Sequence, residues 1–189
     1  MDGRLGVLLK HGDEWEIRFE RRLDHAPEKV WAAITAPGAM SRWFDQTIMP
    51  DPLKVGAVIR FTHNYVGMES HGEITALDPP RLIEWNWIGG FGPASRMRWE
   101  IEPDGQGSRL IMRQQVADPP VTARTMAGWH KCLDRMQAIL DGGEEKPDFE
   151  AWLKLFEDTY KPKVLAAGLT VPQAGAPTRS SNEERESQS

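Results

Sequence analysis

Four side chains between residues 63 and 73 come closest to a metal-binding pattern. They are His63, Glu69, His71 and Glu73, and the last two lie two positions apart, on one face of any strand that contains them. A metal site needs three or four ligands that converge on one point, and two ligands on one strand do not meet this requirement. We therefore predict no metal ion at this cluster.

His130 and Cys132 are the second candidate for chemistry, as a base and a nucleophile. Both fall in a segment with helical periodicity, where residues two apart point about 200° away from each other. They cannot form a catalytic pair, and we expect them to be structural or exposed. The sequence also has no GxSxG, phosphate-binding loop, HExxH or dinucleotide fingerprint. It therefore predicts no catalytic residue and no cofactor, and it favours a protein that is not an enzyme without excluding one.

The longest segment with a sustained helical period spans residues 120–141. Thr122 is a plausible N-cap, and Gly142 and Gly143 can end the helix with a left-handed turn. About twenty residues at about 1.5 Å each give a rod of about 30 Å, which needs a broad partner surface. Steps of three and four place five large residues on one stripe: Met126, Trp129, Leu133, Met136 and Leu140.

Six strands are predicted to supply that partner surface. The first, residues 14–23, alternates apolar and charged side chains, and two short helices follow it, one through Val30 and Ile34 and one through Met40 and Trp43. Turn residues then separate five more strand-like runs: 55–63, 68–78, 82–88, 95–102 and 108–116. Their short connections indicate neighbouring antiparallel strands.

Alternation assigns one face of most of these strands to the long helix. The parity of residues 68–78 is ambiguous, because Ile74 and Leu77 fall on opposite faces. The helix-facing set elsewhere is Ile59, Phe61, His63, Ile83, Trp85, Trp87, Met97, Trp99, Ile101, Leu110, Met112 and Gln114.

The chain is predicted to divide into four parts. Residues 1–13 form an N-terminal segment without a clear period, and 14–142 form the main domain. Residues 143–169 form a helical extension, which we expect to pack on the same chain or on a second copy in a homodimer. Residues 170–189 have hardly an apolar side chain and should be disordered. The predicted apolar stripe of the extension is Phe149, Trp152, Leu153, Phe156 and Tyr160.

Bulk properties narrow the class of protein. A chain of 189 residues suits one domain with an appendage, and its net charge of −5 gives no reason to expect a nucleic-acid partner. The one cysteine allows no intrachain disulfide, and we find neither a signal peptide nor a run long enough to insert into a membrane. A cytoplasmic protein is expected. Eight Trp residues are unusual and suggest a wide, aromatic-lined interior.

Four blocks of sequence carry a family resemblance. FERRLDHAPEKVWAAITAPGAMSRWF, VGAVIRFT, HGEITALDPPRLIEWNW and MRWEIEPDGQGSRLIMRQQV resemble successive blocks of the SRPBCC, or START-like, superfamily, and above all the group named for the activator of the heat-shock-protein-90 ATPase. The resemblance covers residues 15–140. Two features depart from it: Phe44 stands where a second Trp is usual, and the helix after residue 147 lies beyond the usual end.

This resemblance implies an α+β helix-grip fold of the Bet v 1-like kind. In it, a curved antiparallel sheet of about six strands wraps around a long C-terminal helix, with two short helices after the first strand. The helix after residue 147 is then an addition. The fold encloses a cavity between sheet and helix, but activation of a chaperone does not follow from the resemblance.

Ten residues are predicted to line that cavity and bind a ligand. Most are apolar, and His63 and Gln114 add sparse polar groups, as in typical small-molecule sites. The competing interpretation is that the aromatic rings simply fill the core. The ten are Trp43, Phe61, His63, Trp85, Trp87, Trp99, Met112, Gln114, Met126 and Trp129.

Three classes of function remain open. The favoured one is binding of a hydrophobic small molecule, lipid-like or polyketide-like, which needs no acid–base pair. The second is a cyclase-like or hydrolase-like enzyme, which needs a His, Arg or carboxylate inside the cavity. The third is an interaction or chaperone-cofactor module, which would leave Trp152 and Phe156 exposed.

Overall fold

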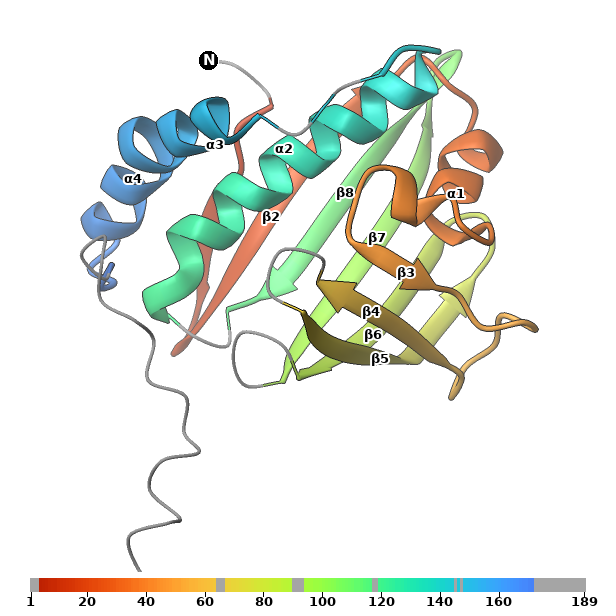
Figure 1. The fold of residues 1–189 in the computed structure, drawn as a ribbon, viewed down its shortest axis with the longest axis horizontal. Helices are drawn as coiled ribbons and strands as arrows, with labels where there is room; N and C mark the ends of the chain where they lie inside the picture. The colour runs from red at the N-terminus through yellow and green to blue at the C-terminus, as the bar shows by residue number, and fades with distance from the viewer. Residues whose placement is uncertain are drawn as a thin grey trace, which may run out of the picture.

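The computed structural model describes residues 4–63, 67–89, 94–116, 119–144, 146 and 148–171. Residues 172–189, which hold nearly all of the tail expected to be disordered, lie outside this part. The described elements form an antiparallel sheet with helices on one face (Figure 1). The strands are β1 Val7–His11, β2 Glu14–Leu23, β3 Gln46–Ile48, β4 Val58–His63, β5 Met68–Asp78, β6 Leu82–Gly89, β7 Ser95–Asp104 and β8 Gly107–Gln115.

The helices occupy three stretches of the chain. Between β2 and β3 lie the α-helix α1 Pro27–Thr35 and the 3-10 turn η1 Met40–Arg42. After β8 come the 3-10 turn η2 Pro119–Val121 and the long helix α2 Thr122–Leu140. The extension consists of α3 Phe149–Leu155, the π-helical turn η3 Phe156–Tyr160 and α4 Lys161–Ala166.

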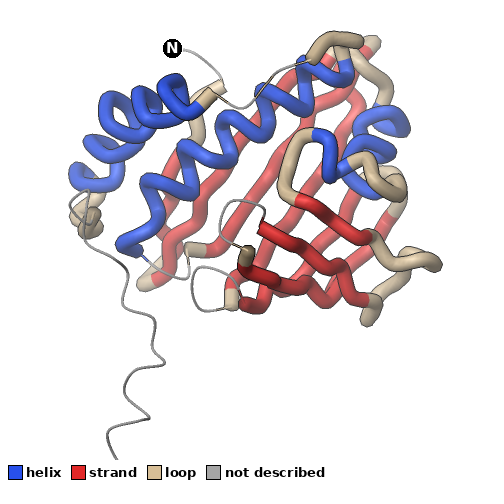
Figure 2. Tube along the Cα trace, viewed as in Figure 1, coloured by secondary structure: helices blue, strands red, loops and turns tan. Residues whose placement is uncertain are grey.

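The strand order is β1-β2-β8-β7-β6-β5-β4-β3, with every neighbouring pair antiparallel. The sheet curves around α2, which runs obliquely across its concave face, as the tube in Figure 2 shows. This confirms the predicted α+β helix-grip fold.

Within the described ranges the sheet has eight strands, so the expectation of about six was wrong. One extra strand, β1, forms a hairpin with β2 through Gly12, whose φ of 62° suits a tight turn that a side chain would disfavour. The other, β3, has three residues and pairs with β4. Both lie at the edges of the sheet, and each is too short for alternation of side chains to reveal it.

The ambiguous parity of residues 68–78 has a structural cause. The register between β5 and β6 shifts between Ile74 and Ala76, so that the two halves of β5 alternate out of phase. Ser70, Gly72 and Ile74 are buried, whereas Leu77, beyond the irregularity, is half-buried. A single alternation could therefore not describe the whole strand.

The apolar stripe of α2 is buried as predicted. Met126, Trp129, Leu133, Met136 and Leu140 all belong to the core between sheet and helix. The expected cap at the N-terminus of α2 was wrong: Thr122 is the first helical residue, and Val121 occupies the cap position without a side-chain hydrogen bond. The turn η2 directly precedes the helix and places Thr122 one position further along than its sequence suggested.

The extension packs against α2 of the same chain (Figure 1). Asp148 caps α3, because its Oδ1 accepts a hydrogen bond from the backbone N–H of Ala151 at 3.0 Å. The predicted apolar stripe was partly wrong, since Phe149 is 71% exposed and Leu153 41% exposed. The buried residues are Phe156 and Tyr160, which belong to the predicted stripe, and Val164, which follows the π-helical turn on α4.

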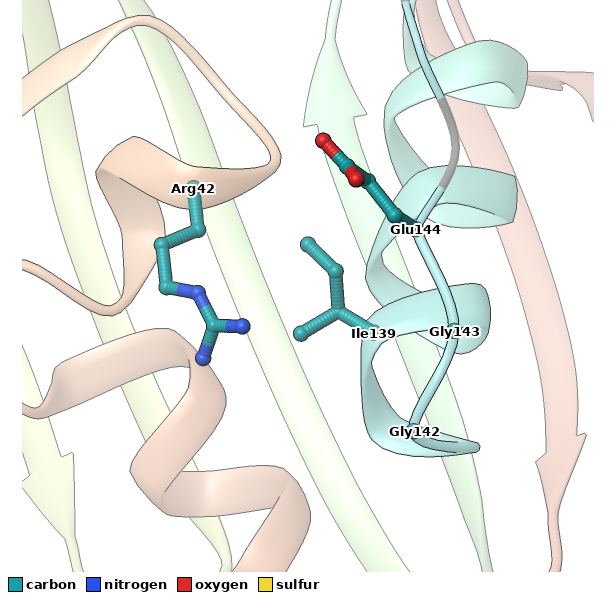
Figure 3. Close-up of a pocket in the computed structure, with 5 residues that line it drawn as sticks. All are labelled: Arg42, Ile139, Gly142, Gly143 and Glu144. Atoms are coloured by element: carbon teal, nitrogen blue, oxygen red, sulfur yellow. The ribbon is translucent and has the colours of Figure 1, made fainter.

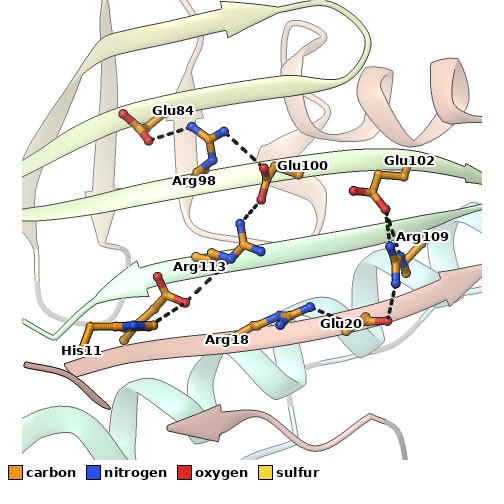
Figure 4. Close-up of polar contacts among 10 residues, drawn as sticks. His11, Arg18, Glu20, Glu84, Arg98, Glu100, Glu102, Arg109 and Arg113 are labelled. Carbon is orange, nitrogen blue, oxygen red and sulfur yellow. Dashed lines mark hydrogen bonds and ion pairs between the residues drawn. The ribbon is translucent and has the colours of Figure 1, made fainter. Parts of the chain in front are cut away.

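The convex face of the sheet carries alternating charges. Glu100 on β7 bonds both Arg98, on the same strand, and Arg113 on β8, and Arg98 also reaches Glu84 on β6 (Figure 4). Arg109 joins Glu102 and Glu20 further along. The positive and negative side chains on this face are therefore largely paired with one another. The apolar residues lie on the opposite face, which packs against α2. No helix in the described ranges is long and apolar enough to cross a membrane.

Candidate functional site

The ten predicted ligand-binding residues come from five elements and the residue after η1, which meet between the sheet and α2. Trp43 follows η1, and the others lie on β4, β6, β7, β8 and α2. Seven of them are buried hydrophobic core residues; His63 is a buried polar residue, and Trp87 and Gln114 are half-buried. The fold therefore brings the set together, while its role in binding stays a prediction.

Aromatic rings from these elements form one continuous cluster. Trp99 contacts Trp43, Trp85 and Trp129, with ring centroids 5.6 to 6.4 Å apart. Phe61 stacks on Trp87 at 4.7 Å. These separations are in the range of favourable aromatic pairs. The rings therefore stabilise one another as a connected group.

Phe44 completes this cluster, although the sequence did not identify it as a site residue. Its ring stacks on Trp129 with centroids 4.9 Å apart and planes 7° apart, and it meets Phe61 and Trp87 edge-on. The family resemblance contained a signal for it, because an aromatic Trp is usual at this position. Phe44 is half-buried and lies at the more accessible end of the cluster, beside Trp87.

The deep end of the cluster is closely packed. Trp85, Trp99, Met112 and Met126 have 0% exposed surface, so no water-sized space borders them. The indole ring of Trp85 lies against the backbone at Gly72, where an added Cβ would come within 2.4 Å of Cδ1. A ligand that reaches these residues must therefore separate the rings.

Two polar groups in this deep region have no hydrogen-bond partner among the described residues. They are the indole Nε1–H groups of Trp85 and Trp99, both buried. A buried donor without a partner costs about 1–3 kcal/mol, so such groups are uncommon in folded proteins. Trp129 differs, because its Nε1–H donates to Oε1 of Gln114 at 2.7 Å. Gln114, another predicted ligand-binding residue, is thus held in place by the long helix.

A set of three hydrogen-bonded polar side chains lies at the end of the cluster near Phe44. His63 Nδ1 lies 2.7 Å from Oδ2 of Asp45, and His63 Nε2 lies 2.9 Å from Oγ of Ser70. The Ser70 hydroxyl also accepts a hydrogen bond from Nε1 of Trp87 at 2.9 Å. The sequence indicated His63 but neither Asp45 nor Ser70, because Asp45 lies between η1 and β3 and the parity of β5 was ambiguous.

The other candidates for chemistry do not converge. Glu69, His71 and Glu73 are exposed on one face of β5, whereas His63 points into the core, and no metal-type group of three or more forms within the described ranges. His130 Nε2 pairs with Asp134, and its Nδ1 bonds the hydroxyl of Tyr160, so His130 has structural contacts. Burial raises the pKa of the Cys132 thiol, which favours its protonated, less nucleophilic form.

One open pocket of about 600 Å³ lies away from the aromatic cluster, at the C-terminal end of α2. In Figure 3 the side chains of Arg42 and Glu144 flank Ile139, with Gly142 and Gly143 forming the wall beside them. None of the ten predicted ligand-binding residues lines it. We therefore do not assign the predicted site to this pocket.

Known proteins show the same architecture. The crystal structure of CalU16 from Micromonospora echinospora aligns with a TM-score of 0.68 at 21% identity, covering 85% of this chain and 94% of CalU16. A conserved protein of unknown function from Enterococcus faecalis aligns with a TM-score of 0.65 at 16% identity, covering 84% and 91% of the two chains. DynU16, a protein in the dynemicin biosynthetic locus, aligns with a TM-score of 0.60 at 21% identity, covering 68% of this chain and 48% of DynU16.

These identities indicate a shared fold. The likeness to CalU16 extends into the extension, since 85% of 189 residues exceeds the 142 that precede Gly143. The comparison with curated proteins finds no match. The model of the family described as activator of Hsp90 ATPase homolog 1-like protein matches residues 24–141, more than half of the chain. The chain therefore belongs to this family, within the SRPBCC superfamily that its sequence blocks resembled and whose helix-grip fold it adopts.

Proposed function

We propose that this protein binds a hydrophobic small molecule in the aromatic cluster between the sheet and α2. The observation that carries the proposal is the pair of buried indole donors on Trp85 and Trp99, which lack hydrogen-bond partners within the part of the chain that the structure describes. A ligand with acceptor oxygens on an apolar frame satisfies these donors and replaces the ring contacts it displaces. This chemistry favours a polyketide-like ligand over a plain hydrocarbon chain.

The route to these donors begins at Phe44. Its ring is half-buried and stacks on Trp129, so a flat ligand that displaces Phe44 can occupy the same stacking position. Gln114 adjoins Trp129 and offers a further polar group at this end. A mostly apolar site with a few placed polar groups is typical of small-molecule pockets.

The description of one similar structure is consistent with this class of ligand. DynU16 belongs to a biosynthetic locus by its description, and CalU16 shares the fold over nearly its whole length. The interaction-module alternative is less favoured, because Phe156 is buried and Trp152 half-buried in the extension. Activation of the Hsp90 ATPase, which the family description names, is not part of the proposal.

The test uses an apolar fluorescent probe such as Nile red, titrated into the full-length protein. We expect Phe44→Ala, Trp99→Ala and Met126→Ala to change the Kd of the probe about tenfold or more, which corresponds to about 1.4 kcal/mol. Arg18→Ala, on the convex face, and Trp152→Ala, in the extension, are the controls and should leave the Kd within about twofold. Unchanged affinity in all three cluster variants would overturn the proposed site.

The physiological ligand can be sought directly. Native mass spectrometry of the protein purified from its own host should detect a bound small molecule. Trp99→Ala purified in the same way should carry less of it, whereas Trp152→Ala should carry the same amount.

A further inference from the structure

Asp45, His63 and Ser70 form a line of three side chains beside the aromatic cluster. The Asp45 carboxylate lies 2.7 Å from Nδ1 of His63, and the Ser70 hydroxyl lies 2.9 Å from Nε2 of the same ring. The pairing of β4 with β5 brings Ser70 close to His63. Ser70 lies opposite Phe61, and Phe61 and His63 are two positions apart on β4, so all three side chains are on the same face of the sheet. Asp45, His63 and Ser70 thus occupy the positions of an orienting acid, a base and a hydroxyl nucleophile.

The hydrogen bond to Asp45 assigns the tautomer of the neutral imidazole. A carboxylate can only accept, so Nδ1 of His63 carries the proton that Asp45 receives. In the neutral imidazole, Nε2 then presents its lone pair to the Ser70 hydroxyl and accepts a hydrogen bond from it. This tautomer is the one that lets a histidine take a proton from an attacking serine.

We propose that Ser70 is a nucleophile that His63 activates and Asp45 orients, and that it cleaves esters with an apolar, planar acyl or alcohol group. Ser70 Oγ attacks the ester carbonyl carbon while its proton passes to His63 Nε2. The bond from the carbonyl carbon to the alcohol oxygen then breaks, and His63 returns the proton to that oxygen. Water attacks the acyl–Ser70 ester by the same route, which releases a carboxylic acid and restores the hydroxyl.

The surroundings set the class of ester. Phe61 stacks on Trp87, and the His63 ring lies nearly parallel to Trp87, with planes 11° apart. A flat apolar group fits beside these rings. Nε1–H of Trp87 already donates to Ser70 Oγ and can donate instead to the carbonyl oxygen as negative charge develops there.

Access to Ser70 uses the same end of the cluster as the proposed binding function. Ser70 is 5% exposed and His63 8% exposed, and half-buried Trp87 adjoins both. Opposite Ser70 on β6 stands Gly89, which has no side chain to cover it. The substrate therefore approaches Ser70 past the edge of the Trp87 ring, which leaves its Nε1–H within reach of the carbonyl oxygen.

The experiment labels the full-length protein with diisopropyl fluorophosphate. Attack by Ser70 Oγ forms an oxygen–phosphorus bond and expels fluoride, while the proton passes to His63. We expect one adduct in the intact mass, mapped by peptide fragmentation to Ser70. Ser70→Ala should abolish it, and His63→Gln should slow labelling at least about 100-fold, a typical contribution of a general base. Asp45→Asn should slow it at least about tenfold.

Matched controls separate chemistry from folding. Ser108→Ala removes another buried serine of the same sheet, and His71→Ala removes the histidine next to Ser70 on the outer face of β5. Both should be labelled at the rate of the unchanged protein. Hydrolysis of p-nitrophenyl butyrate should follow the labelling rate in every variant.

The outcomes are distinguishable from those of the binding proposal. Absence of an adduct at Ser70 in the folded protein, or equal labelling of His63→Gln, overturns the nucleophile even if Nile red binds. Labelling of Ser70 without Nile red binding supports the nucleophile and counts against the ligand site. Should Ser70→Ala fail to fold, the mapped adduct on the unchanged protein and the rate of His63→Gln still decide the question.

Discussion

The hydroxyl of Tyr160 lies 2.7 Å from Nδ1 of His130, a buried contact that joins the extension to the long helix. The same hydroxyl accepts a hydrogen bond from the backbone N–H of Gly6 at 3.0 Å, so one side chain ties together three segments distant in sequence. The opposite side of His130 faces Asp134, which also reaches the buried guanidinium of Arg21. The extension therefore closes a polar network that begins in the main sheet.

Replacing Tyr160 by Phe should destabilise the protein by about 1–3 kcal/mol. The ring still fills its place, but Gly6 N–H and His130 Nδ1 lose a partner inside the protein. Urea unfolding measures the change. Phe149→Ala, at a residue that is 71% exposed, is the control and should stay within about 0.5 kcal/mol. Equal stability of Tyr160→Phe and the unchanged protein would contradict the structural role of this hydroxyl.

Ending the chain after Lys146 should lower the melting temperature by roughly 10 °C or more. Phe156, Tyr160 and Val164 would no longer be buried, and each such side chain contributes about 1.5–3 kcal/mol. A chain that ends at Val171 is the control and should melt like the full-length protein. Because this face packs on its own chain, a homodimer is not needed to cover it, and light scattering should give a monomer mass. Unchanged melting of the shorter chain would mean that the extension adds no stability.

Asp134 should make stability depend on pH in the acid range. Burial by itself raises the pKa of Asp134, but the hydrogen bond from His130 and the charges of His130, Arg21 and Lys131 outweigh burial and lower the pKa. A carboxyl whose folded pKa is below its unfolded value stabilises the fold above the unfolded pKa, about 4 for Asp, and loses this contribution as pH falls through the folded pKa.

The measurement compares Asp134→Asn with the unchanged protein across pH. At neutral pH the variant should be less stable by about 3 kcal/mol, because Arg21 keeps a buried charge without its carboxylate. Below about pH 4 the difference should shrink. Asp158→Asn, at an exposed position, should track the unchanged protein throughout. A difference that stays constant down to pH 2 would rule out titration of Asp134 as its source.

The charged network on the convex face should contribute little to stability. Glu100 bonds Arg98 and Arg113, yet both arginines are partly exposed, so Glu100→Gln should cost about 1 kcal/mol or less. The cost should fall further in about 1 M salt, which screens such pairs. Glu69→Gln, on the exposed face of β5, gives the baseline. A loss above about 2 kcal/mol would mean that the network acts as a buried one.

The sequence by itself determined the local elements and which of their faces is buried. Alternation placed Phe61, Trp85 and Trp99 on the inner face, and the helical period placed Met126 and Trp129 opposite them, because a side chain's direction within a strand or helix depends only on its position along that element. The sequence blocks likewise indicated the family, and the family implied the fold. These features are local, so a single sequence contains them.

Only the tertiary structure decided the contacts between elements. Asp45, His63 and Ser70 come together because β3, β4 and β5 pair in one register, and the irregularity after Ile74 hid the inner face of β5 from any simple alternation. In the extension, Val164 on α4 is buried whereas Phe149 at the start of α3 is exposed, and only the packing against α2 decided between them. Hydrogen bonds between strands and the packing of one helix on another depend on distances that sequence spacing does not contain, and these interactions placed the polar groups of the candidate site.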